Sequence, residues 1–283
     1  MLRQFRLNPS SFTMLASWMV AMVLVFAVAC GPSGPSVEEV QAERSAALNE
    51  IVDAKAALDA KRQELAELRD TLANPVDEEA AGGEAADGEA AEGGDEAQLS
   101  PEDLEVKVNQ LASEVEDETQ EVVKRIVEFI NSDPPTRGEP LSDLQKQAAD
   151  LKIQEDILVA REWIEKGGDY KRAINILEQA LPLDSENESL KQELASAQEW
   201  RFVTEERFGG VEKGQTEAEV RKVLGPVNLR NVKEYPERNV TLWLYPKDEA
   251  GNAAGVYFRP QRGELKVYQT NFSAVNRDEE PEA

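Results

Sequence analysis

Few residues of this chain could do chemistry, because it contains a single cysteine, Cys30, and no histidine. The lack of histidine excludes Ser-His-Asp and Cys-His nucleophile systems and every histidine-based zinc or iron site. The 56 acidic side chains leave open a carboxylate-only active site or a calcium site. No Asp-rich calcium-binding loop is present, and no spacing singles out a Glu pair or a Ser-Lys dyad. The sequence therefore predicts a protein that is not an enzyme and holds no metal or cofactor.

The N-terminal segment has the layout of an export signal. Arg3 and Arg6 are followed by an uncharged apolar stretch, 14–29, in which small residues precede Cys30. Residues 1–29 are therefore predicted to be a signal peptide that is cleaved before the cysteine. An uncleaved transmembrane anchor and an ordinary secretory signal with a leftover thiol are the alternatives. The apolar run falls short of the roughly 20 residues of a membrane span, which favours cleavage.

The same stretch, Ala27-Val28-Ala29-Cys30, resembles the lipobox of bacterial lipoproteins, with Ala27 in the place where that family usually has leucine. The resemblance implies that Cys30 carries fatty acyl chains of the palmitate type and anchors the chain in a membrane. Gly31 does not match the residues that keep such lipoproteins at the inner membrane. We therefore expect the periplasmic face of the outer membrane, with residues 30–36 as a lipidated tether.

The composition is acidic and strongly charged. The net charge is −25, and 31% of the residues are charged whereas 6% are aromatic. Such acidity argues against nucleic acid as a partner, because binding there depends on Lys and Arg neutralising phosphates. The same numbers suit a chain of solvated helices and linkers with one or two modest cores.

Heptad spacing of apolar residues predicts a coiled-coil helix over 37–75. Asn74-Pro75 ends it, and residues 76–100, which carry nine acids and no base, are predicted to be a disordered acidic linker. Ser100-Pro101 then starts a second seamed helix over 101–131. The seam residues of the first helix are Val37, Val40, Ala47, Ile51, Ala54, Leu58, Leu65, Leu68 and Leu72.

These two helices have two ways to bury their seams. They can fold back as an antiparallel hairpin, which would bring Lys61 near Glu118, or they can pair with another chain, including a second copy. The hairpin is favoured because it needs no partner. Two solvated, separate helices are the third alternative.

A Pro-rich break follows, and residues 142–207 are predicted to form a small helical domain that begins at Ser142. Within it, Ala160, Ala173 and Ala180 stand where two antiparallel helices would cross closely, and the segment resembles one degenerate tetratricopeptide repeat. Arg161 departs from that pattern, and a generic helical hairpin is the alternative.

Residues 208–275 resemble the SmpA/OmlA (BamE-like) family of outer-membrane assembly lipoproteins. The resemblance lies in Phe208, Val211, Gly214-Gln215-Thr216, Val220 and Leu224-Gly225-Pro226. Thr216 and Glu219 form a capping box for a short helix, which Gly225-Pro226 ends. Strands are expected at 229–235, 240–246, 254–259 and 264–275, in the antiparallel sheet that the resemblance implies. Residues 276–283 are predicted to be a disordered acidic tail.

Strand alternation predicts two faces for this sheet. One face is expected to pack on the helix and carries Val240, Leu242, Leu244, Val256, Phe258, Leu265 and Val267. The other is a candidate partner-binding face and carries Trp243, Tyr245, Tyr257, Arg259, Lys266 and Tyr268. The alternative, which we favour, is that another part of the chain covers this aromatic face and makes it a second core layer.

The fold class expected from these patterns is multi-domain and mainly α. A coiled-coil stalk and a helical-hairpin domain precede a small α+β domain with an antiparallel sheet. The function expected is a lipid-anchored envelope scaffold or adaptor that binds envelope or outer-membrane proteins, and the family resemblance implies a role in outer-membrane protein assembly. The alternative is an inhibitor of an envelope hydrolase that acts through the aromatic face.

Overall fold

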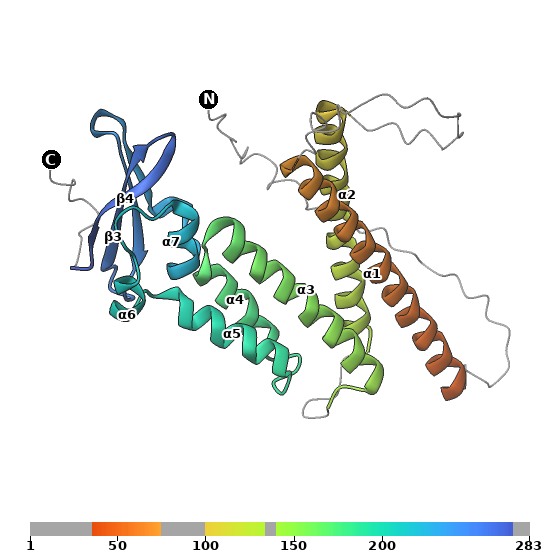
Figure 1. The fold of residues 1–283 in the computed structure, drawn as a ribbon. Helices are drawn as coiled ribbons and strands as arrows, with labels where there is room; N and C mark the ends of the chain where they lie inside the picture. The colour runs from red at the N-terminus through yellow and green to blue at the C-terminus, as the bar shows by residue number, and fades with distance from the viewer. Residues whose placement is uncertain (1–35, 75–99, 134–139, 274–283) are drawn as a thin grey trace, which may run out of the picture. The chain divides into compact units, whose positions relative to one another are not determined.

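The structure is a computed structural model that describes residues 36–74, 100–133 and 140–273 (Figure 1). These residues form seven α-helices and, at the C-terminal end, a four-stranded antiparallel sheet. The mainly helical layout with a small C-terminal α+β part is confirmed. The predicted signal peptide, Cys30, the acidic linker and the acidic tail lie outside the described residues. None of the helices in the described ranges is both long and apolar enough to cross a membrane.

Polar caps fix the starts of the helices, as the sequence indicates. Ser100 caps α2, Ser142 caps α3 with a capping box, and Thr216 caps α7 with Glu219 closing a second capping box. The helices are α1 Val37–Ala73, α2 Pro101–Asn131, α3 Asp143–Gly167, α4 Tyr170–Ala180, α5 Glu188–Arg201, α6 Glu205–Gly209 and α7 Glu217–Leu224.

Helices α1 and α2 pack against each other in opposite directions. Among the described residues five ion pairs join them, and residues later in α1 pair with residues earlier in α2. Two of the five belong to Lys61, which makes the Glu118 contact that the hairpin prediction required and also lies 3.7 Å from Glu114. The others are Glu64–Lys107 at 3.0 Å, Glu50–Arg125 at 3.4 Å and Arg44–Asp133, whose acid lies just beyond α2. Leu48, Ile51 and Leu58 share one core with Val122, Ile126 and Phe129 of α2 and Ala148 of α3.

The buried stripe of α1 differs from the predicted seam. Val37 and Val40 are 82% and 42% exposed, so the first turns of α1 do not bury the seam. Leu48, absent from the predicted seam, is 2% exposed. The stripe is shifted because α1 contacts both α2 and α3, which requires a wider apolar face than a two-helix seam.

A matched pair of substitutions on α1 measures this packing. Leu58 is fully buried, whereas Val52 is 42% exposed on the same helix. We expect Leu58→Ala to lower the free energy of unfolding by about 3 kcal/mol, because it leaves a cavity. Val52→Ala should change it by less than about 0.5 kcal/mol. Urea unfolding followed by circular dichroism gives both numbers, and equal effects would contradict the packing of α1.

Helices α3, α4 and α5 lie side by side and share a second core. Ala160, Ala173 and Ala180 are 0–1% exposed in this core, in line with their expected place at a close helix crossing. Arg161, the departure from the repeat pattern, points to α5 and binds the Glu193 carboxylate at 2.7 Å. The surface ion pair between α3 and α5 therefore explains why arginine stands at position 161, where the repeat pattern departs.

The sheet is an antiparallel meander in the order β1-β2-β3-β4. Its strands are β1 Val232–Tyr235, β2 Val240–Pro246, β3 Ala253–Gln261 and β4 Glu264–Asn271. Helix α7 packs on one face, where Val220 and Leu224 contact the sheet core. The free edge of β4 is covered by the turn before α7, because Gly214 N–H donates to the Val267 carbonyl oxygen and Val267 N–H donates to that of Gln215.

The predicted faces of β2 are wrong, and those of β3 and β4 are right. Trp243 pairs with Val256 across the strands and its ring lies 4.6 Å from that of Phe258, so it faces α7. Tyr245 faces α7 as well, and Val240, Leu242 and Leu244 lie on the opposite face. The two alternating sets of β2 side chains are both apolar, so the strand's own sequence does not indicate which set faces α7. The register with the neighbouring strand determines it.

Candidate interaction site

The predicted aromatic face is only partly assembled. Tyr257, Arg259, Lys266 and Tyr268 lie on the sheet face opposite α7, where the Arg259 guanidinium covers the Tyr268 ring at 4.1 Å. Trp243 and Tyr245 lie in the other core and are 2% and 4% exposed. Because these two residues are inside the fold, they do not belong to this face.

Little of that face is accessible. Tyr257 is 5% exposed and packs with Val240, Leu242 and Leu244 in a core of its own. Lys266 is half-buried and pairs with Glu264 at 3.4 Å. Arg259 alone among the four is exposed. The aromatic residues of this face therefore behave mainly as a second core layer of the sheet.

A more open hollow lies where the helical segment meets the end of the sheet. It is a cleft of about 210 Å³ between the α3–α4 turn, the end of α5 and β2. Val203 N–H donates to the Pro246 carbonyl oxygen at 2.8 Å and links the segment after α5 to the end of β2. Gly168, in the left-handed conformation, places the α3–α4 turn directly against Val227. These contacts hold the walls of the cleft together.

Aromatic rings line much of this cleft, contributed by Tyr170, Trp200, Phe202 and Tyr245. Burial raises the pKa of the Tyr170 hydroxyl to about 12, so it stays protonated at neutral pH. Burial also raises the pKa of Tyr245, whose hydroxyl donates to the Gly225 carbonyl oxygen at 3.2 Å. The rings are therefore neutral, partly desolvated surfaces suited to apolar contact.

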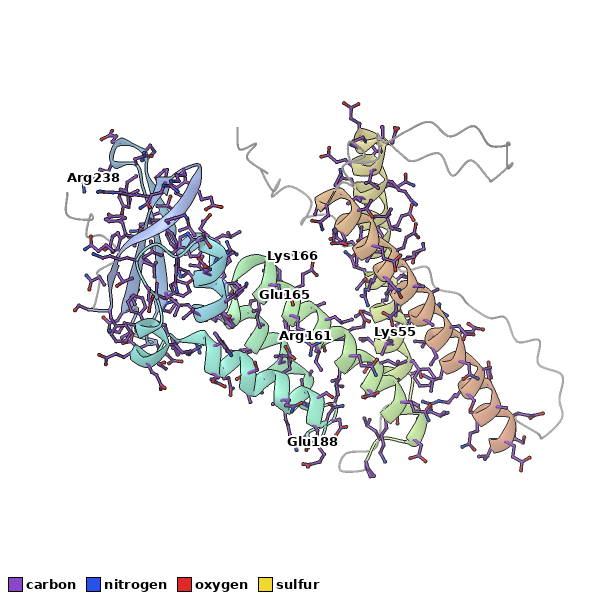
Figure 2. The ribbon with its side chains drawn as sticks, viewed as in Figure 1. Lys55, Arg161, Glu165, Lys166, Glu188 and Arg238 are labelled. Atoms are coloured by element: carbon purple, nitrogen blue, oxygen red, sulfur yellow. The ribbon has the colours of Figure 1, made fainter. Side chains whose placement is uncertain are left out.

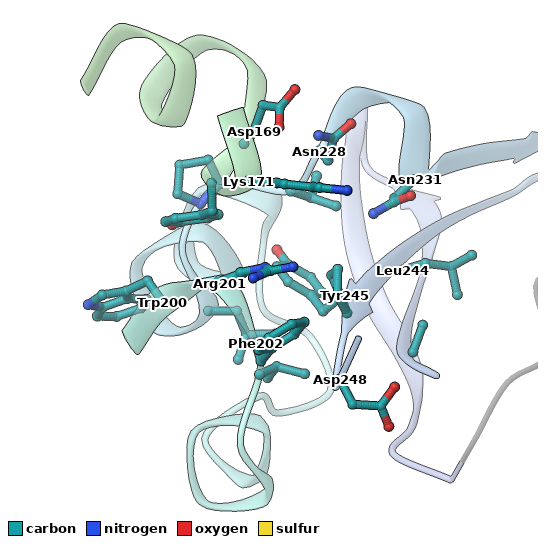
Figure 3. Close-up of a pocket in the computed structure, with 18 of the residues that line it drawn as sticks. Asp169, Lys171, Trp200, Arg201, Phe202, Asn228, Asn231, Leu244, Tyr245 and Asp248 are labelled. Carbon is teal, nitrogen blue, oxygen red and sulfur yellow. The ribbon is translucent and has the colours of Figure 1, made fainter. Parts of the chain in front are cut away.

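Two cationic side chains extend into the cleft from different helices. Figure 3 shows Lys171 of α4 pointing toward Asn228 and Asn231, and Arg201 of α5 lying between Lys171 and Phe202. Arg201 pairs with Glu249 at 3.2 Å, a carboxylate whose side chain is 77% exposed. Within the described residues Lys171 has no hydrogen-bond or ion-pair partner. A free ammonium group therefore faces the opening.

The acidic residues of the cleft are already engaged. Asp169 accepts a hydrogen bond from the Arg172 N–H at the start of α4. Asp248 accepts hydrogen bonds from the Asn252 side chain and backbone, which lower the pKa of its carboxyl group. In the described ranges no three acidic or cysteine side chains converge as a metal site would require. Each of these two carboxylates is therefore held by a neighbouring group.

A second hollow of about 330 Å³ adjoins the cleft and shares Tyr170, Trp200 and Pro226 with it. Ala197 of α5, Gly225 after α7, Arg161 and Glu193 also line it. The two hollows together form a surface with Tyr170 and Trp200 in common. Sequence patterns missed this site, because its residues come from segments that no local periodicity connects.

Buried charges join α1 to α3 at a separate place. Glu155 is fully buried and accepts hydrogen bonds from the Arg62 guanidinium at 2.9 and 2.7 Å, and Lys55 lies 2.9 Å away (Lys55 is labelled in Figure 2). Burial acts to raise the pKa of Glu155, but the bonds from Arg62 and Lys55 outweigh it and lower that pKa. Leu48, Lys55 and Arg62 recur at heptad spacing, which is the signal that sequence analysis overlooked.

The comparisons with known proteins add no family. No protein-family model matches the chain, and no curated protein or solved structure matches it either.

Proposed function

We propose that this protein is a lipid-anchored adaptor of the bacterial cell envelope that binds another envelope protein through its C-terminal half. Cys30 is the anchor, α1 and α2 form the spacer, and the cleft between α4, α5 and β2 is the binding site. In terms of the family resemblance, the partner belongs to the machinery or the substrates of outer-membrane protein assembly. The proposal includes no chemical step.

The observation that carries the proposal is the cleft. Interface hot spots are rich in aromatic residues and arginine, and this cleft combines Trp200, Phe202 and Tyr170 with Arg201. Its carboxylates are held by neighbouring groups and do not converge, which is unlike a hydrolytic pair. Its walls come from several elements that close contacts fix, so the surface is preorganised for binding.

Acylation of Cys30 is tested directly with a clickable palmitate analogue in a bacterial host. We expect the wild-type protein to take up the label and to partition with membranes, because two or more acyl chains give stable anchoring. Cys30→Ser should lose all of the label and appear in the soluble fraction. Retention of label by Cys30→Ser, or its absence from the wild type, would contradict the lipid anchor.

The kind of partner is tested by affinity purification from envelopes solubilised in mild detergent. Enrichment of outer-membrane assembly proteins would support the proposed role. Enrichment of a soluble envelope hydrolase would instead support the inhibitor hypothesis, which rests on the exposed Arg259 above the Tyr268 ring. Arg259→Ala separates the two, because it should reduce recovery of the hydrolase and leave binding at the cleft unchanged.

A further inference from the structure

We infer that the cleft recognises a carboxylate side chain of its partner, held by Lys171 and flanked by Asn228 and Asn231, with aromatic neighbours of that carboxylate packed on the cleft walls. This inference rests on the proposed function and names the chemistry of the partner segment. The partner is a separate protein that presents an acidic segment.

The charge balance of the cleft leaves one cation without a partner among the described residues. Each of the cleft's three carboxylates is already held. Asp169 accepts a hydrogen bond at the start of α4, Asp248 accepts one from the Asn252 side chain, and Glu249 pairs with the Arg201 guanidinium. Among the described residues Lys171 has no such partner, and it is exposed at the opening. The uncommitted charge in the cleft is therefore positive, although the chain as a whole carries −25.

Hydrogen-bond donors lie around that charge. The Asn228 side-chain oxygen accepts from the Arg230 N–H at 3.0 Å, and its amide NH₂ group, which has no partner among the described residues, remains available as a donor. The Asn231 side-chain amide makes no hydrogen bond within the described ranges, and Figure 3 shows it beside Lys171. An ammonium with neighbouring amide donors matches a carboxylate, which only accepts hydrogen bonds.

An apolar surface lies next to these donors. Tyr170, Phe202 and Leu244 line the same cleft, so a carboxylate at Lys171 would have apolar walls within one or two residues along an extended peptide. Arg201 adds a second cation to the cleft, and because it already pairs with Glu249 at 3.2 Å, Lys171 is the cation left for an incoming carboxylate. A partner segment with acidic and aromatic residues side by side fits both features.

The test uses the full chain in detergent and two fluorescein-labelled octapeptides, Gly-Ser-Phe-Asp-Glu-Phe-Ser-Gly and its Asn-Gln counterpart. Fluorescence anisotropy should show saturable binding of the acidic peptide below about 1 mM, and binding of the amide peptide about 10-fold weaker. Lys171→Met should weaken binding of the acidic peptide about 10-fold and leave the affinity for the amide peptide unchanged. Lys171→Arg should bind the acidic peptide within about 3-fold of the wild-type affinity.

Lys166→Met is the matched control, because Lys166 pairs with Glu162 on α3 and does not line the cleft. It should leave both affinities unchanged. Equal binding of the two peptides, equal loss of both on Lys171→Met, tighter binding of a lysine-bearing counterpart, or no binding at 1 mM would overturn the inference.

Two further experiments distinguish a separate partner from the chain's own C-terminal residues, and the carboxylate inference from the proposed adaptor function. A variant truncated after Asn276 tests the chain's own acidic C-terminal residues as the occupant. A rise of about 10-fold or more in peptide affinity on truncation would assign the cleft to that segment and overturn a separate partner. If affinity purification recovers an envelope partner whose binding is lost on Trp200→Ala but unaffected by Lys171→Met, the adaptor function stands and the carboxylate is wrong.

Discussion

Replacing Glu155 with alanine is expected to lower the free energy of unfolding by about 3 kcal/mol, although the residue lies far from any site proposed for binding. Its carboxylate is fully buried and neutralises two cations, Lys55 and Arg62. The Lys55 side chain is 8% exposed, so removal of Glu155 leaves a desolvated ammonium with Asp59 as its remaining partner. Breaking a buried pair in this way costs more than the pair itself contributes.

A double variant makes this prediction sharper. Lys55→Met combined with Glu155→Leu removes both buried charges and keeps the volume apolar, so it should be much less destabilised than Glu155→Ala alone. Glu193→Ala is the control, because it breaks the Arg161–Glu193 pair, in which Arg161 is 54% exposed. Its cost should be below about 1 kcal/mol. Thermal and urea unfolding by circular dichroism measure all three, and equal costs for Glu155→Ala and Glu193→Ala would contradict a buried ionic cluster.

The same cluster predicts a loss of stability in acid. The pKa of Glu155 is lowered in the folded protein, so its contribution is present above the unfolded value of about 4.3. That contribution is lost as the pH falls through the lower, folded pKa. The midpoint of thermal unfolding should therefore fall more steeply below about pH 4 for the wild type than for the Lys55→Met/Glu155→Leu variant. Parallel pH profiles would show that the Glu155 carboxyl carries no such contribution.

Local signals predicted the helices well because helix ends are decided by neighbouring residues. Ser142 with Gln145, and Thr216 with Glu219, each form a capping box within one turn, so their effect is visible in the sequence. The Lys61–Glu118 contact was also predictable, because only one antiparallel alignment of the two seams brings the interrupting charges together.

Features that depend on residues far apart in the chain were not predictable in the same way. The face of β2 depends on which residue of β3 pairs with Trp243, and both alternations of β2 are apolar. Glu155 pairs with residues on α1, 93 positions from Arg62, and a lone glutamate in an acidic helix gives no warning of that. The cleft is likewise a product of how α4, α5 and β2 meet, which no local pattern encodes.

The second large effect is expected at Gly168, where the α3–α4 turn packs against Val227 and Asn228 beside the cleft. Gly168 has φ +57°, and an added Cβ would lie 2.5 Å from the Val227 carbonyl oxygen and 2.6 Å from the Asn228 nitrogen. Gly168→Ala should therefore cost about 3 kcal/mol or more, from left-handed strain together with a clash against backbone that cannot move aside.

Alanine substitutions at two other glycines separate the effect of backbone strain from that of the clash. Gly214 has φ +92° and open space around its Cβ position, so Gly214→Ala should show the strain alone, about 1 kcal/mol. Gly167, next to Gly168, has neither a positive φ nor a close neighbour, and Gly167→Ala should be neutral or slightly stabilising. Urea unfolding gives the three values. If Gly168→Ala costs no more than Gly214→Ala, the α3–α4 turn does not pack on Val227.

The Gly168→Ala variant also connects stability to binding. Any relief of its clash must move the start of α4 away from Asn228, and Lys171 moves with that helix. The acidic octapeptide should then bind about 10-fold more weakly to Gly168→Ala, at a temperature where the variant is still folded, while Gly214→Ala keeps its affinity. Unchanged peptide binding in a destabilised but folded Gly168→Ala would mean that the separation between Lys171 and Asn228 does not matter for recognition. Such a result would place the carboxylate elsewhere in the cleft, nearer Arg201, because that side chain comes from α5 and not from the displaced turn.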